Sequence, residues 1–277
     1  MRWGVYGRNG FEGVEAFRLG ALAAGQCAQA RSVSDYTSGQ TEDFDAVAVF
    51  GLQGRGPAVL SDYQATGVPV VVIDYGYIRR ANHAFEWRTG HWQVSLGGLN
   101  RLPPADLCDE SRLDALGVEI AQQGGDPAGY TLLTVQTTGD ASHGMDERQL
   151  SKWCADMAGI WPNLVIRPHP LQEHLTYGLP VCEWQTLDEA LAGASLVVTG
   201  NSNSGHDALL AGVPAVAMLP GAAWADLSGP NLPSMARRRQ HFARCAWGQW
   251  TWQEFREGKP QRFLIDQWMP ATRCSPA

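Results

Sequence analysis

Two stretches, Val165-Ile-Arg-Pro-His-Pro170 and Thr199-Gly-Asn-Ser-Asn-Ser-Gly-His-Asp-Ala-Leu-Leu210, decide the predicted fold. Each includes or follows a short apolar run, residues 164–166 and 195–199, that is typical of a buried strand. The first run ends in a proline-flanked turn with a cation and an imidazole. The second ends in small hydroxyl and amide residues before a helical pattern. Because the first N–H groups of a helix point outward and favour anions, we expect both turns to contact a phosphate.

The alternation of strand and helix continues on both sides of these stretches. Further strands are predicted at residues 3–6, near 32, and at 46–50, 68–73, 130–135 and 213–218. Helices are predicted at residues 58–65, 113–122, 146–160, 187–192 and 207–211. A further amphipathic helix is predicted after the first strand, with Val14, Phe17, Ala21 and Leu22 on one side. Strands that alternate with helices predict parallel sheets with covered faces. Residues 82–100 are aromatic and irregular, which favours a loop with short strands.

Turn-rich segments divide the predicted elements into two halves. Arg101-Leu-Pro-Pro-Ala105 and Gln123-Gly-Gly-Asp-Pro-Ala-Gly129 have the composition of a boundary. We therefore predict an α/β protein with two Rossmann-like domains, residues 1–122 and 123–230. A ligand cleft is expected between them, at the carboxyl ends of the strands. Residues 231–277 are predicted to form a helical tail that packs back on the N-terminal domain.

Composition narrows the class of protein. The 277 residues are 44% hydrophobic and 18% charged, which describes a globular protein. No apolar run approaches the ~20 residues that span a bilayer, and the N-terminus leads directly into a strand, so a cytoplasmic location is expected. The net charge of −7 argues against broad nucleic-acid binding, although Arg237-Arg-Arg239 with Arg244 leaves a local basic site open. The six cysteines are scattered, so we expect reduced thiols and no structural zinc.

Four motifs follow one another in a fixed order. They are Asp74-x-Gly-Tyr-x-Arg79 with Gly97-Gly-Leu-Asn100 downstream; Gln136-x-x-x-Asp140-x-Ser142; Arg167-Pro-His-Pro170; and Ser202-x-Ser-Gly-His-Asp207-Ala-Leu-Leu-x-Gly212-x-Pro214. Together they resemble the capsule polysaccharide synthesis family, whose members include β-Kdo transferases. The stretch around Trp224 is similar to that family's Gly-Trp-Gly loop. The resemblance extends over residues 68–228.

This resemblance implies a GT-B-type glycosyltransferase that needs no metal and no cofactor. Its substrates would be a nucleotide-sugar donor of CMP or UDP type, held by the C-terminal domain, and an acceptor held by the N-terminal domain. Asp207 stands where the family has a glutamate suited to the ribose or base. The expected donor-binding residues are Gln136, Arg167, His169, Asn201, Ser202, Ser204, Gly205 and Asp207.

The chemistry of glycosyl transfer selects the candidate catalytic residues. An oxocarbenium-like transition state requires a carboxylate near the anomeric carbon, as nucleophile or base. Asp140, Asp74 and Glu86 are the candidates, and the resemblance favours Asp140. Cationic groups at the departing phosphate stabilise the charge that develops there, which suits Arg167 and His169. Each residue also has an ordinary structural interpretation: Asp140 as a turn aspartate, and the serine segment as a helix cap.

The acceptor is the more open question. Arg8, Arg55, Tyr77, Arg79 and Arg80 are the expected acceptor or cleft residues, or are simply solvated. The resemblance points to a glycan or glycolipid. The arginines instead suit modified DNA, as in a phage-type glycosyltransferase that acts on hydroxymethylated bases. A third alternative is a nucleotide-sugar-binding module without catalysis.

Overall fold

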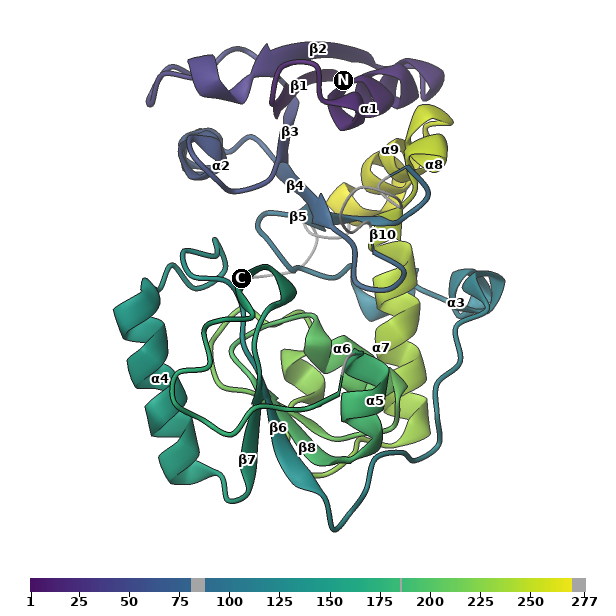
Figure 1. Cartoon of the computed structure of the whole chain (residues 1–277). Coiled ribbons are helices and arrows are strands. Elements are labelled where there is room, and N and C mark those ends of the chain that lie inside the picture. The colour runs from purple at the N-terminus through teal and green to yellow at the C-terminus, as the bar shows by residue number, and fades with distance from the viewer. Residues whose placement is uncertain (81–87, 185, 271–277) are drawn as a thin grey trace. The chain divides into compact units, whose positions relative to one another are not determined.

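The computed structural model describes residues 1–80, 88–184 and 186–270 (Figure 1). The chain forms two compact units. The first unit combines Met1–Leu116 with Phe242–Ala277, and the second unit is the uninterrupted stretch Gly117–His241. Each unit is built around one β-sheet covered by helices, so the chain is a mixed α/β protein as predicted.

The sheet of the first unit has six strands in the order β10-β5-β4-β3-β1-β2. Their bounds are β1 Arg2–Gly7, β2 Cys27–Ser32, β3 Ala46–Phe50, β4 Val70–Tyr75, β5 Trp92–Leu96 and β10 Gln249–Trp250. Strands β1 to β4 pair in parallel, whereas β5 is antiparallel to β4 and β10 is antiparallel to β5. The prediction of a parallel sheet therefore applies to β1 to β4, whereas the edge formed by β5 and β10 is antiparallel.

Alternate side chains of β1 face two separate cores. Trp3 and Val5 pack in one cluster with Phe17 of α1 (Glu12–Ala23). Tyr6 faces the other side, where α2 (Gly56–Ala65) contributes Tyr63. This period of two is what a strand buried on both faces requires.

The C-terminal segment completes the first of these cores. Trp252 and Phe255 of α8 (Trp252–Arg256) are buried there, and α8 packs against α1. A Cβ atom at Gly20 would lie 1.7 Å from the Phe255 carbonyl oxygen, so only glycine allows this approach. Leu22, predicted on the buried side of α1, is instead 48% exposed.

The sheet of the second unit is parallel throughout, with the order β7-β6-β8-β9. The strands are β6 Tyr130–Thr134, β7 Leu164–Arg167, β8 Ala194–Thr199 and β9 Ala215–Ala217. Figure 1 shows α4 (Glu147–Ile160) on one side of this sheet, with α5 (Leu187–Ala192) and α6 (Ser204–Leu210) on the other. Asp146 caps α4 in a capping box with Gln149, which fixes where the helix begins.

The remaining helical elements are shorter or lie in the C-terminal part. They are α3 Ser111–Leu116, α7 Met235–Trp247, α9 Lys259–Phe263, the π-helix η5 Leu264–Trp268 and the 3-10 turns η1 Val33–Asp35, η2 Ala105–Leu107, η3 Pro170–Gln172 and η4 Ala225–Leu227. The helix predicted at residues 113–122 ends at Leu116, because Gly117 adopts a left-handed conformation with φ 58°. Among the helices that the structure describes, none has both the length and the apolar character needed to cross a bilayer.

Candidate functional site

The loops that follow β6, β7 and β8 begin side by side at the carboxyl edge of the second sheet. Thr134 at the end of β6 pairs with Arg167 at the end of β7 and with Thr199 at the end of β8. Because the three strands are parallel and end level, their loops start at one edge. This edge is where ligands bind in open parallel sheets.

Ser142 connects the loop after β6 to the loop after β8. Its hydroxyl accepts a hydrogen bond from Gln136 Nε2 at 2.8 Å. It lies 2.7 Å from Asp140 Oδ1 and 2.8 Å from Asn201 Oδ1, and it has one hydrogen to donate to either. Asn201 in turn donates through Nδ2 to the Ser142 carbonyl oxygen at 3.0 Å. The predicted residues Gln136, Asp140 and Asn201 therefore meet around a serine that the sequence interpretation had given no role.

The loop after β7 contacts the loop after β6 through Gln172 and Thr138. Gln172 Oε1 accepts from Thr138 N at 2.9 Å, and its Nε2 donates to Thr138 Oγ1 at 2.8 Å. His169, which begins η3, accepts from Leu171 N through Nδ1 at 3.2 Å. A neutral imidazole whose Nδ1 accepts carries its proton on Nε2, so His169 presents an N–H donor.

The serine segment is fixed by a buried tryptophan. Trp224 is fully buried and donates from Nε1 to the Ser202 carbonyl oxygen at 2.9 Å. A Cβ atom at Gly205 would lie 2.0 Å from the Trp224 ring, so Gly205 is needed for this packing. Ser204 Oγ lies 2.6 Å from Thr134 Oγ1 and is buried, which makes it a link between β6 and α6. Gly205 and Ser204 thus shape the segment, and Ser202 is the more accessible of the two hydroxyl residues.

Three other predicted residues lie differently. Arg167 donates from one terminal nitrogen to the Trp184 carbonyl oxygen at 2.7 Å, which directs part of its guanidinium to the main chain. Asp207 is half-buried in the first turn of α6. Glu86 lies outside the described residues, so the structure does not place this catalytic candidate.

The Asp74-x-Gly-Tyr-x-Arg79 motif belongs to the first unit, and two glutamine side chains fix its main chain by hydrogen bonds. Gln249 of β10 is fully buried, and its Oε1 accepts from Tyr77 N at 2.8 Å and from Ile78 N at 2.9 Å. Gln93 of β5 donates to the Tyr75 carbonyl oxygen and to Asn100 Oδ1. It thereby connects this motif with the Gly97-Gly-Leu-Asn100 segment. Neither glutamine was predicted, because neither lies inside a motif.

Tyr77 does not line an accessible surface, which corrects its assignment to the acceptor side. It is fully buried, and its hydroxyl lies 3.0 Å from both Gln93 Oε1 and Ser95 Oγ. Burial raises the pKa of this phenol above its usual value. Asp74, a catalytic candidate of the same motif, accepts from the Tyr75 main-chain N–H at 2.7 Å and is half-buried. Its turn is therefore satisfied locally.

The predicted arginines of the first unit lie near its strand ends. Arg8 lines a pocket of about 270 Å³ that follows β1 and β2. Arg55 is exposed and donates to the Tyr36 carbonyl oxygen. Arg79 is exposed and has the left-handed value φ 46°, which is uncommon for a residue with a side chain. Arg80 Nη1 lies 3.5 Å from the Tyr77 carbonyl oxygen.

The basic run of α7 is largely committed to main-chain carbonyls. Arg238 is 1% exposed and donates to the carbonyl oxygens of Leu209, Ala121, Gln122 and Pro233. Burial lowers its pKa below the usual value. Arg237 donates to the Asp226 carbonyl oxygen. Within this run Arg238 is therefore buried, whereas the Arg237 side chain is exposed.

Comparison with known proteins bears on the fold. The sequence matches no protein-family model and no curated protein. Among solved structures, a KpsC β-Kdo 2,4-transferase from Thermosulfurimonas dismutans is similar, with a TM-score of 0.57 at 16% identity over 88% of this chain and 90% of that chain. A KpsC β-Kdo 2,7-transferase from the same organism has a TM-score of 0.48 at 12% identity, covering 94% of this chain and 99% of that one.

A UDP-GlcNAc 2-epimerase from Methanocaldococcus jannaschii has a TM-score of 0.34 at 11% identity, with 96% and 99% of the two chains covered. At such identities the likeness to the 2,4-transferase concerns the fold alone. Together with the two α/β units and their sheet topology, it shows that this chain has a GT-B-like fold with Rossmann-like units.

Proposed function

We propose that this protein is a GT-B-type glycosyltransferase whose second unit binds a nucleotide-sugar donor at the carboxyl edge of its parallel sheet. The observation that carries the proposal is that the loop after β6 is hydrogen-bonded both to the loop after β8, through Ser142, and to the loop after β7, through Thr138. The four motifs that resemble the capsule polysaccharide synthesis family support the transfer of a sugar to a hydroxyl group, by a reaction that needs no metal ion. A CMP- or UDP-type donor is the chemistry that this resemblance favours.

The residues of the cluster divide into positioning residues and residues that meet the donor. Gln136 Oε1 accepts a hydrogen bond from Asn201 N at 3.2 Å, and its Nε2 donates to the Ser142 hydroxyl. Gln136 therefore positions the loops after β6 and β8. The neutral His169 ring supplies an Nε2–H donor for the phosphate that departs, and Arg167 is the cation beside it in the motif. Charge-assisted hydrogen bonds of this kind stabilise the leaving group as its charge grows.

Asp140 is the proposed carboxylate near the anomeric carbon. Its Oδ1 accepts from Ser142 N at 2.8 Å, and it lies 2.7 Å from the Ser142 hydroxyl, which fixes the orientation of the carboxylate. The Oδ2 atom then represents the reacting oxygen. A carboxylate in this position acts as nucleophile or base toward an oxocarbenium-like transition state.

We assign the acceptor to the first unit, where an aromatic stack ends in an exposed ring. Tyr75 is 49% exposed and stacks on Trp92 with a centroid distance of 5.2 Å. Trp92 stacks in turn on Trp252 at 4.4 Å, so the exposed ring rests on a rigid base. An exposed aromatic face of this kind suits the apolar face of a sugar, which favours a glycan or glycolipid acceptor. Arg79 adds a cation nearby in the sequence.

A thermal-shift screen of the full chain against CMP, UDP, GDP and their sugars tests the donor site. A ligand that binds only the native state raises the melting temperature, so one nucleotide class should give a saturable increase. His169→Ala should weaken that binding, and His174→Ala, at an exposed position of the same loop, should not. If no nucleotide shifts the melting temperature, the donor-site assignment is wrong.

A binding module without catalysis is the second candidate. Its supporting observation is that Asp140 Oδ1 already has local partners, as an ordinary turn aspartate would. Hydrolysis or transfer of the bound nucleotide-sugar separates the two candidates, because a module binds the donor and releases it unchanged. For DNA as acceptor, Arg238 offers no exposed charge, since it is buried.

A further inference from the structure

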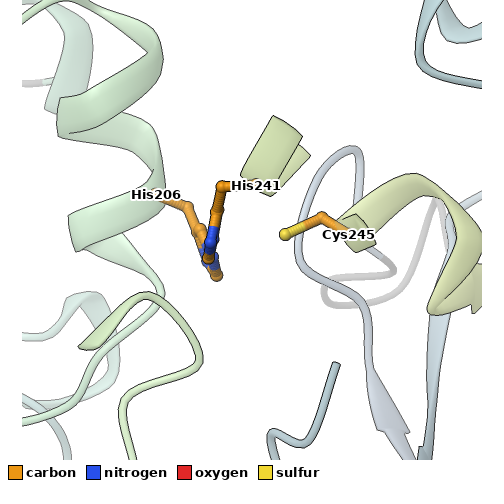
Figure 2. A group of neighbouring side chains, drawn as sticks. All are labelled: His206, His241 and Cys245. Atoms are coloured by element: carbon orange, nitrogen blue, oxygen red, sulfur yellow. The ribbon is translucent and has the colours of Figure 1, made fainter. Parts of the chain in front are cut away.

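Two buried histidines of the second unit face each other through the same ring nitrogen. His206 of α6 and His241 of α7 are 0% and 1% exposed, and their Nε2 atoms are 3.0 Å apart (Figure 2). Their rings are tilted by 33°, so this is an edge-on approach of the nitrogens and not a stack. No role was assigned to His206 from the sequence.

An oxygen lies beside the opposite nitrogen of each ring. His206 Nδ1 is 3.2 Å from Asn203 Oδ1, and His241 Nδ1 is 3.2 Å from Asp226 Oδ1. An amide oxygen and a carboxylate both favour an N–H at the Nδ1 beside them. The His206 Nε2 lone pair then faces His241, whereas His241 Nδ1 lies within ion-pair distance of Asp226 without a hydrogen bond to it. Where the carboxylate keeps the His241 proton on Nδ1, two lone pairs face each other at 3.0 Å and repel, unless a cation lies between them.

Cys245 brings a third donor atom to the same place. It is fully buried and lies four residues after His241 on the continuous helix α7, so the spacing of that helix places both residues on one face. The boundary between the two units falls within this helix. The ligand atoms of His206, His241 and Cys245 all lie within 4.8 Å of one another, and Figure 2 shows the thiol directed toward the two rings.

We propose that His206 and His241, each through Nε2, and Cys245 through Sγ bind one Zn²⁺ ion. Two imidazoles and a thiolate are ligands that zinc prefers, at about 2.0–2.1 Å for nitrogen and about 2.3 Å for sulfur. Donor atoms around a tetrahedral ion of this size are about 3.3–3.7 Å apart. The nitrogen separation of 3.0 Å and the upper limit of 4.8 Å therefore require side-chain adjustments of at most about an ångström.

The oxygens beside both Nδ1 atoms match what zinc-binding histidines require. A metal-bound imidazole donates its other N–H to a carboxylate or carbonyl, which fixes the ring and increases its basicity. Asp226 and Asn203 occupy these places. Both come from the second unit, as do the two histidines. At His206 this outer contact is in place, and at His241 the ring needs only to turn toward Asp226 Oδ1 to make it.

The ion would fix α6 to α7 at a defined point. His206 lies in the first turn of α6, directly after the Ser202–Ser204 segment that follows β8. The role is structural, because the three ligands are buried and no step of glycosyl transfer is assigned to the ion. The proposal does not depend on the proposed function, since it predicts metal binding whatever the protein transfers.

The test is metal binding by the full chain after removal of metal with a chelator. We expect one equivalent of Zn²⁺ per chain by mass spectrometry of the metal content, with submicromolar affinity in competition with a chromogenic chelator. Co²⁺ as a spectroscopic substitute should give the near-ultraviolet absorption of a cobalt–thiolate bond. His241→Ala and Cys245→Ser should each weaken Zn²⁺ binding at least 100-fold. Asp226→Asn should weaken it about tenfold through the lost outer contact.

Matched controls keep the interpretation specific. Cys27→Ser and His174→Ala alter an exposed thiol and an exposed imidazole, and both should bind Zn²⁺ like the unaltered chain. If the unaltered chain binds no Zn²⁺ at micromolar concentration, a shared proton joins the two histidines and the proposal is wrong. Binding that survives His241→Ala and Cys245→Ser would also overturn it, because the ion would then lie elsewhere. The cobalt–thiolate band of the unaltered chain decides the matter even if a variant fails to fold.

Discussion

The two units treat the ends of their strands in opposite ways. In the second unit the loop after β6 is joined by side-chain hydrogen bonds to the loop after β8 at Ser142 and to the loop after β7 at Thr138. In the first unit the motif after β4 is fixed from within by Gln249, which is fully buried. Motifs that follow strand ends thus have different roles in the two units. Those of the second unit keep polar groups accessible for a ligand, whereas the motif after β4 has its main chain fixed by buried hydrogen bonds.

The largest expected effect is at Asp140. Asp140→Asn should lower turnover about 1000-fold, because it removes the charge of the proposed catalytic carboxylate. The amide oxygen can still accept from Ser142 N, so donor affinity should change by less than about twofold. Turnover and calorimetric affinity for the nucleotide-sugar found in the screen are the two measurements.

The control for this change is Asp156→Asn, which alters an exposed carboxylate of α4. Turnover should be unaffected there. If Asp140→Asn keeps normal turnover, the accessible cluster of the second unit is a binding site only, and the catalytic group must be sought elsewhere.

The second effect concerns the motif after β4. Gln249→Leu keeps the volume but leaves Tyr77 N, Ile78 N and the Ile78 carbonyl oxygen without this buried partner. Buried polar groups that lose their hydrogen-bond partner in this way should lower the free energy of unfolding by about 3 kcal/mol. Hydrogen exchange of the peptide over residues 74–78 should accelerate, while peptides of the second unit keep their protection. Gln267→Leu, at an exposed position, should leave both unchanged.

A third change probes how the serine segment is supported. Gly205→Ala places a methyl group about 2.0 Å from the Trp224 ring, so the tryptophan must move. Overpacking of this kind should lower the free energy of unfolding by about 2 kcal/mol. When Trp224 moves, its hydrogen bond to the Ser202 carbonyl oxygen is lost, so donor binding should weaken as well. Gly159→Ala in α4 has open space around its Cβ and should stabilise the helix by about 0.5–1 kcal/mol. Urea titrations of both variants give the comparison.

The smallest expected effect is a pH dependence of the stability of the first unit. His91 is 8% exposed, and burial lowers its pKa from the usual 6.5. The unfolded chain therefore binds a proton at this residue at pH values where the folded chain does not. Stability should fall as the pH drops below about 6.5, and the loss should continue down to the lowered folded pKa. Hydrogen exchange of β4 at pH 5 and pH 7 measures it, and His91→Gln should flatten the slope.

The sequence was most informative where the chain repeats a simple pattern. The strands β3 and β8 and the helices α4 and α5 lie within a residue or two of their predicted ranges, because apolar runs and capping residues mark them locally. The convergence of Gln136, Asp140 and Asn201 also agrees with the expectation that parallel strands bring their loops to one edge.

What the sequence did not reveal depends on distant partners. Gln249 contacts Ile78 across 171 positions, and nothing around it in the sequence marks it as a buried clamp. Tyr77 lies in a motif, but its burial follows from the antiparallel strand β5 beneath it. The His206–His241 pair spans 35 residues without a recognisable metal-binding spacing. A boundary inside the continuous helix α7 likewise leaves no turn or change of composition to mark it.

The second unit is one unbroken stretch of chain, whereas the first is made of two stretches that flank it. During synthesis the ribosome therefore finishes residues 117–241 before it has made β10 and α8, which the first unit needs for its sheet and for one of its cores. The second unit is therefore translated in full before the C-terminal stretch of the first unit. A chain that ended just after His241 would contain every strand of the second sheet but would lack strand β10 and helix α8 of the first unit, so it would expose part of that unit's apolar core.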